Sequence, residues 1–158
     1  MTRVGVTGHR DLCAVTRRLV TAAIAAELAG YPRLHGISSL AEGADQIFAD
    51  QVLRARGALT AVIPSTGYGE AFETSAGRAV YRQLRARATE VIELPFPGPS
   101  EEAYWEAGRR IVCLSDVLLA VWDGNPSGGI GGTADVVSFA GERGVPTTVL
   151  WPAGSRRV

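Results

Sequence analysis

Residues 117–122 form an unbroken apolar run, Val-Leu-Leu-Ala-Val-Trp. A strand with one wet face alternates apolar and polar side chains, and this run does not. A continuous apolar strand is typical of a parallel sheet whose two faces are both covered by helices. The run is also far shorter than the roughly 18 residues that a membrane-spanning helix needs. The chain therefore has to supply helices for both faces of a sheet.

The rest of the chain supplies them, because strand-like and helix-like segments alternate along it. Val20, Ile24 and Leu28 recur at every fourth position, which predicts the apolar stripe of an amphipathic helix. We expect strands over residues 3–7, 33–39, 58–64, 90–94, 117–122 and 146–151, and helices over 15–29, 44–56, 72–88, 101–113 and 133–143.

Alternation with short connections favours a parallel sheet. We predict an α/β fold, a Rossmann-like three-layer sandwich with a mostly parallel sheet of about six strands and helices on both faces. The 158 residues suit one domain with its own core. We place this single domain at residues 1–152 and expect the polar, basic residues 153–158 to form a flexible tail.

Composition excludes several classes of function. Sixteen basic residues balance sixteen acidic ones, which argues against a surface built for nucleic acid. The chain has no lysine, so a Walker A loop and Schiff-base catalysis are ruled out. Cys13 and Cys113 lack metal-ligand spacing, and we expect two reduced, half-buried thiols and no metal site. Without a leader-like start or an apolar span, a cytoplasmic location is expected.

In a parallel sheet all the loops that leave the strands lie on one edge, where ligands bind. The first such loop contains Gly8, His9 and Arg10. Gly8 allows a tight turn, and Arg10 can bond a phosphate unless it pairs instead with Asp11 or Glu42. His9 either contacts a ligand or holds the loop together.

The second loop, residues 38–45, carries two hydroxyls and a glycine ahead of a helix. Glu42 is a candidate acceptor for ribose hydroxyls. Asp45 falls in the first turn of the helix, where it either contacts a ligand or interacts with the helix dipole.

The third loop, residues 123–133, contains five glycines and precedes a helix. A turn needs one or two, whereas a loop whose amides surround a phosphate needs several. Thr133 is a candidate both to cap the helix and to contact the phosphate. The match of residues 129–134 to the dinucleotide fingerprint is too poor to predict a standard dehydrogenase.

Tyr68 is the best aromatic candidate for stacking on a base, since its loop leaves the same edge of the sheet. The candidate binding residues are Gly8, His9, Arg10, Ser39, Leu40, Ala41, Glu42, Gly43, Asp45, Asp123, Gly124, Gly129, Gly131, Gly132 and Thr133.

Four segments of the chain together resemble motifs of the SLOG superfamily. They are Thr-Gly-His-Arg at 7–10, Ser-Ser-Leu-Ala-Glu-Gly-Ala-Asp at 38–45, Trp-Asp-Gly at 122–124 and Gly-Gly-Thr-Ala-Asp at 131–135. This superfamily includes LOG-type phosphoribohydrolases, DprA-like and YpsA-like proteins. The likeness covers almost the whole chain. It implies a Rossmann-like fold, a site at these loops for a nucleotide, nucleoside monophosphate or ADP-ribose-like ligand, and a homodimer. We expect that no cofactor is required.

LOG-type enzymes carry Pro-Gly-Gly-x-Gly-Thr-x-x-Glu, and the resemblance implies that the catalytic Glu would stand at position 136. That position is Val136, and Asp135 is turned about 100° from it on a helix. Asp135 and Glu42 are the remaining candidates for a catalytic carboxylate.

Three functions follow from these observations. The chain is a nucleotide-binding or sensing module, a LOG-like N-glycoside hydrolase acting on nucleoside monophosphates, or a structural protein. The last has to explain five glycines in one loop without a ligand.

Overall fold

A computed structural model describes residues 1–158. Strands and helices alternate along its whole length, as the sequence predicts. The elements are β1 (Thr2–Gly8), α1 (Ala14–Leu28), β2 (Leu34–Ser38), α2 (Ala44–Arg54), β3 (Ala58–Ile63), a short 3₁₀ turn (Gly69–Ala71), α3 (Ser75–Arg87), β4 (Glu90–Glu93), α4 (Glu101–Leu114), β5 (Val117–Val121), α5 (Thr133–Glu142) and β6 (Thr147–Val149).

The six strands form one sheet in the order β4-β3-β2-β1-β5-β6. Every neighbouring pair is parallel, so the sheet is parallel throughout. The chain moves outward from β1 to β4 and then returns to the other side of β1 with β5. This reversal places the switch point between β1 and β5, which is where ligands bind in open parallel sheets. The predicted Rossmann-like sandwich is confirmed.

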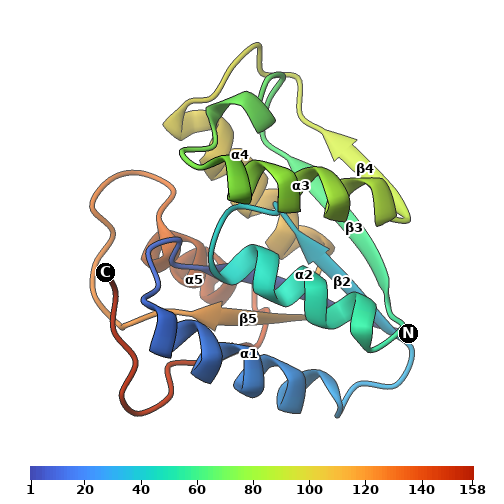
Figure 1. Cartoon of the computed structure of the whole chain (residues 1–158), viewed down its shortest axis with the longest axis vertical. Coiled ribbons are helices and arrows are strands. Elements are labelled where there is room, and N and C mark those ends of the chain that lie inside the picture. Colours follow the sequence, from blue (N-terminus) through green and yellow to red (C-terminus); the bar gives the residue numbers. More distant parts are fainter.

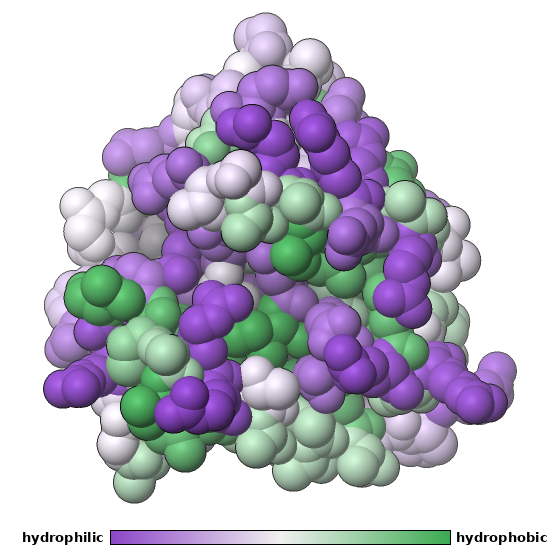
Figure 2. All heavy atoms as spheres, in the orientation of Figure 1, coloured by the Kyte–Doolittle hydropathy of each residue, from purple (hydrophilic) through white to green (hydrophobic).

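Helices cover both faces, as Figure 1 shows: α1, α2 and α3 lie on the near face, and α4 and α5 lie behind. Leu119 of β5 packs in the core under α1 and α2, whereas its neighbour Leu118 packs in the core under α4 and α5. Both faces of β5 are therefore dry, which explains the apolar run at 117–122. Figure 2 shows the near face, where hydrophilic side chains gather over α3 and hydrophobic ones are interspersed lower down.

A third core cluster lies under α2 and α3, against β3. Its aromatic members, Tyr68 and Tyr81, pack edge to face with ring centroids 5.4 Å apart. Phe72 adds an edge contact to Tyr68 at 5.2 Å. These ring contacts hold the loop after β3 against the core.

One predicted helix start is wrong. The helix expected from residue 72 begins at Ser75, because the Thr74 hydroxyl accepts a hydrogen bond from the Gly77 amide at 2.9 Å and caps it. α5 begins at Thr133 as predicted, but its N-cap is Gly132 and not Thr133. The Ser127 hydroxyl accepts from the Asp135 amide at 3.3 Å, and the Thr133 and Ala134 amides have no acceptor in the protein.

Residues 153–158 lie against the start of α1. The Val158 amide donates to the Asp11 carbonyl at 2.7 Å, and the Arg156 amide donates to the Thr16 hydroxyl at 2.7 Å. The flexibility expected of this segment stays a prediction. Cys13 is half-buried as expected, but Cys113 is exposed on α4, which corrects the expectation for that thiol. None of the helices combines the length and the apolar character needed to span a membrane.

Candidate functional site

A cavity of about 780 Å³ opens along the carboxyl edge of the sheet, a volume typical of small-molecule sites. Its walls come from the loops after β1, β2, β3 and β5 and from the start of α4. It lies beside the long connection between β5 and α5, which is on the left in Figure 1. Of the candidate residues, the lining includes Gly8, His9, Arg10, Ser39, Ala41, Glu42, Asp45, Gly129, Gly131, Gly132 and Thr133.

Four candidate residues lie behind this lining. Leu40 is fully buried in the core and adopts a positive φ of 59°. Gly43, Asp123 and Gly124 support the loops without facing the cavity. The loops predicted from the sequence therefore border one cavity, and four of the candidate residues lie behind its lining.

The first two loops are pressed together at the start of α2. The Ala44 amide donates to the His9 carbonyl at 3.1 Å. A Cβ on Gly43 would lie 2.5 Å from the same carbonyl oxygen, and Gly43 has a φ of +82°. Only glycine fits both demands, which explains why the loop carries it here.

The third loop presents backbone amides without acceptors. The amides of Gly128, Gly129, Thr133 and Ala134 donate to no atom of the protein. The last two belong to the uncapped first turn of α5, where the helix dipole is positive. Amides arranged around a helix N-terminus form an anion-binding site.

Gly131 gives this loop its shape. Its φ is +84°, and a Cβ there would lie 3.0 to 3.1 Å from atoms of Trp105, including its backbone. Its amide donates to the Asp135 carboxylate at 2.9 Å. Gly128 differs from it, because a Cβ at that position would meet nothing within 4 Å.

We predict that Gly131→Ala lowers the free energy of unfolding by about 1–2 kcal/mol, because the Cβ of alanine is strained in the left-handed backbone conformation. Gly128→Ala is the matched control and should change it by less than about 0.5 kcal/mol. Urea denaturation of the two variants measures the difference. Equal stabilities would show that the loop does not hold this backbone geometry.

The carboxylates proposed for catalysis are both committed to local hydrogen bonds. Asp135 accepts from the Gly131 amide and does not line the cavity, whereas Val136 does. Glu42 lines the cavity but accepts from the Thr74 hydroxyl at 3.1 Å and the Thr74 amide at 3.4 Å. Glu42 therefore braces the start of α3 and does not pair with Arg10. A catalytic role for either carboxylate stays a prediction, and the geometry gives it little support.

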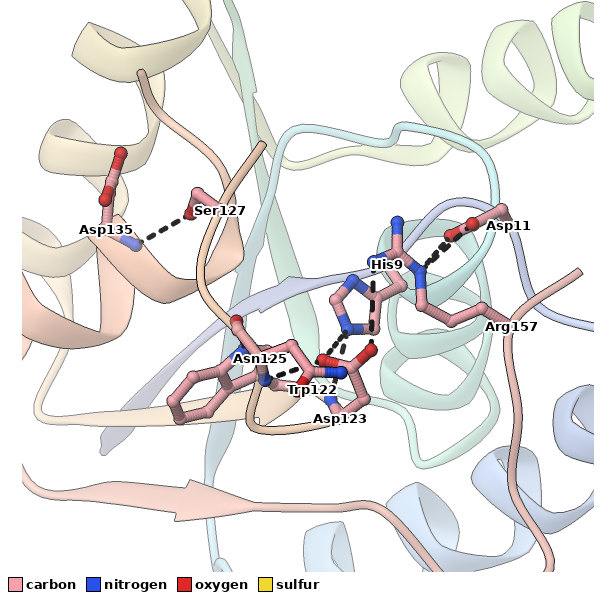
Figure 3. Close-up of polar contacts among 8 residues, drawn as sticks. All are labelled: His9, Asp11, Trp122, Asp123, Asn125, Ser127, Asp135 and Arg157. Carbon is pink, nitrogen blue, oxygen red and sulfur yellow. Dashed lines mark hydrogen bonds and ion pairs between the residues drawn. The ribbon is translucent and has the colours of Figure 1, made fainter. Parts of the chain in front are cut away.

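His9 joins the loops after β1 and β5 (Figure 3). Its Nε2 lies 3.0 Å from the Asp123 amide and 3.1 Å from the Asp123 carboxylate. Burial lowers the pKa of His9, and nearby Arg157 lowers it further against the opposing effect of Asp123. The ring is therefore neutral at pH 7, and we assign Nε2 as the acceptor of the amide proton.

Arg157 is a lining residue that sequence reasoning missed. Its Nε donates to both Asp11 carboxylate oxygens, at 2.8 and 3.0 Å, and its Nη1 lies 3.8 Å from Asp123 (Figure 3). Asp11 therefore pairs with Arg157 and not with Arg10. The Arg10 guanidinium group lies over the Tyr104 ring, 5.7 Å from its centroid. The only available signal was the basic character of residues 153–158. Two guanidinium groups, Arg10 and Arg157, consequently border the cavity.

Asp45 and Tyr68 are, with His9, the buried ionisable groups of the cavity lining. Asp45 is 9% exposed, and the only hydrogen bond to its carboxylate comes from the Ala41 amide at 3.3 Å. Burial raises the pKa of Asp45 to about 7, although that hydrogen bond and Arg10 oppose the rise. Burial, with help from Asp45, also holds the pKa of Tyr68 well above its usual value. A carboxyl that titrates near neutrality inside a cavity is typical of functional sites.

This raised pKa predicts a pH-dependent effect of Asp45→Asn on stability. The folded state holds the Asp45 proton more tightly than the unfolded state, so the wild type loses stability as pH rises from about 4 to 7. Asp45→Asn removes that loss and should be stabilised relative to wild type by up to about 4 kcal/mol at pH 8 and by less at pH 5.

Chemical denaturation at the two pH values measures this difference. Asp50→Asn is the control, because Asp50 lies on the same helix in an exposed ion pair with Arg54. An Asp45→Asn effect that is the same at pH 5 and pH 8 would contradict the prediction.

No three His, Cys, Asp or Glu side chains gather closely enough to hold a metal ion. The groups available to a ligand are instead amides, two guanidinium groups, a buried carboxyl and a phenol. This combination suits an organic phosphate with hydrogen-bonding groups beyond the phosphate.

No family model matches the sequence, and no curated protein matches it significantly. Solved structures do match. DNA processing protein A from Helicobacter pylori has 18% identity and a TM-score of 0.71, over 99% of this chain and 68% of that one. The Streptococcus pneumoniae protein has 18% identity and a TM-score of 0.72, over 98% of this chain and 52% of that one.

The molybdenum cofactor binding protein from Rippkaea orientalis is similar at 16% identity and a TM-score of 0.56, over 96% of this chain and 77% of that one. Of the Streptococcus pneumoniae protein, this chain spans about half the length. The TM-scores show that the chain shares the fold of these proteins, and at identities of 16–18% the likeness extends to the fold alone.

Proposed function

We propose that this chain binds a nucleotide or nucleotide derivative through its phosphate group and acts as a binding or sensing module. The observation that carries the proposal is the set of acceptor-free amides around the start of α5, which faces the cavity together with Arg10. Any helix leaves its first amides unbonded, but here Gly128 and Gly129 add two more amides without acceptors on the same cavity wall.

Arg10 supports the same assignment. It is exposed, makes no ion pair, and lies across the Tyr104 ring at the cavity rim. Its guanidinium group is free to form a bidentate bond with phosphate oxygens. Neither the ligand's base nor a homodimer is implied by these contacts, and the homodimer stays a prediction.

Thermal denaturation with AMP, ADP, ATP, cyclic nucleotides, NAD and ADP-ribose tests the proposal. A ligand at about 100 times its dissociation constant should stabilise the protein by roughly 2.7 kcal/mol. For a chain of this size that corresponds to a rise in melting temperature of roughly 5–10 °C. We expect at least one nucleotide to give such a rise and Arg10→Ala to lose most of it.

Arg18→Ala is the matched control, because Arg18 is exposed on α1 and does not line the cavity. It should keep the full rise. A panel that produces no rise, or a rise that survives Arg10→Ala, would reject phosphate binding at this site.

A second candidate is hydrolysis of the N-glycosidic bond of a nucleoside monophosphate. One observation favours it: Asp45 is a buried cavity carboxyl with a pKa near 7, suited to donate a proton at neutral pH. In this reaction water adds at C1′ of AMP as the C1′–N9 bond breaks, which releases adenine and ribose 5-phosphate.

Chromatography of AMP incubated with the protein separates the two candidates. Under the first proposal AMP remains intact. Adenine release that is lost in Asp45→Asn and kept in Asp135→Asn would establish the second, because Asp135 lies outside the cavity lining. Release that Asp45→Asn does not affect would reject Asp45 as the proton donor.

A further inference from the structure

Two polar side chains of the cavity have hydrogen-bonding capacity that the protein does not use. Tyr68 is only 6% exposed, and its hydroxyl has no partner in the protein. Asp45 is similarly buried and accepts a single long bond from the Ala41 amide, which leaves one carboxylate oxygen free. The only fully buried side-chain oxygens without a partner belong to Ser65 and Ser155, so the free oxygens of Tyr68 and Asp45 are open to the cavity and can bond a ligand there.

Both side chains are held in place from behind. The ring of Tyr68 packs edge to face against Phe72 and Tyr81, at 5.2 and 5.4 Å. Asp45 lies in the first turn of α2, and the Ser38 hydroxyl donates to its carbonyl oxygen at 3.2 Å. Fixed groups of this kind recognise a ligand with little entropic loss.

Their place in the sheet relates them to the anion site. Asp45 follows β2, the neighbour of β1, and β1 in turn neighbours β5, which leads into the glycine-rich loop. Adjacent strands are about 4.8 Å apart. The strands that lead to Asp45 and to the start of α5 are therefore two spacings apart, about 10 Å.

We propose that Asp45 and Tyr68 bind the ribose hydroxyls of the ligand and so select ribonucleotides over deoxyribonucleotides. This inference rests on the proposed function, because it takes the phosphate to lie at the glycine-rich loop. In a nucleotide the sugar hydroxyls lie a few bonds from the phosphate, and Asp45, Tyr68 and the start of α5 all line the same cavity. Carboxylate acceptors paired with sugar hydroxyls are a general solution in folds of this type.

Calorimetric titration with ribose 5-phosphate, 2-deoxyribose 5-phosphate, AMP and 2′-deoxy-AMP tests the proposal. We expect each deoxy compound to bind roughly 10-fold to 100-fold more weakly than its ribose counterpart, the range for one lost hydrogen bond to a charged group. The sugar phosphates carry no base, so their difference reports on the sugar alone.

Tyr68→Phe removes only the hydroxyl and keeps the packed ring, and Asp45→Asn keeps the size of the side chain. Both should bring the ribose preference down toward one. Tyr31→Phe is the matched control, because the Tyr31 hydroxyl bonds Glu27 of α1 and Tyr31 does not line the cavity. It should leave the preference unchanged.

The failures are distinguishable. Absence of binding by all four compounds, together with a flat nucleotide panel, would reject the proposed function itself. Equal binding of ribose and deoxyribose compounds would overturn this inference and leave phosphate binding in place. A ribose preference that survives both variants would likewise overturn it, since other residues would then read the sugar.

Discussion

Gly8 is the point at which three loops of the site meet. A Cβ there would lie 2.5 Å from the Ala44 side chain and 2.8 Å from that of Val121, so the end of β1 touches both the start of α2 and the end of β5. This close approach brings the three exit loops to one place on the sheet edge. The cavity, the amide cluster and the buried carboxyl all depend on that distance being short.

The resulting site has two chemically different ends. One end is made of backbone amides and the positive end of α5, and it favours an anion whatever the side chains are. The other end is made of Asp45 and Tyr68, two largely buried side chains that can form hydrogen bonds with a ligand. The zero net charge of the chain hides this contrast, because local fields and not the total charge decide what binds.

The fold and the loops of the site could be predicted because their signals are local. The apolar run at 117–122 requires two covered faces, and glycines ahead of helices mark the turns. The hydrogen bonds that the charged side chains form could not be predicted, because their partners are distant in the sequence. Glu42 bonds Thr74, 32 residues away, and Arg157 bonds Asp11, 146 residues away. The helix register did predict that Asp135 faces away from the position of Val136, and only Val136 lines the cavity.

The contact between Arg157 and Asp11 also affects when the site can exist. Asp11 follows β1 and Arg157 follows β6, so this border of the cavity forms only where two segments 146 residues apart in the sequence are both folded. Local opening of either segment would therefore remove one border of the cavity without breaking any strand pair of the sheet.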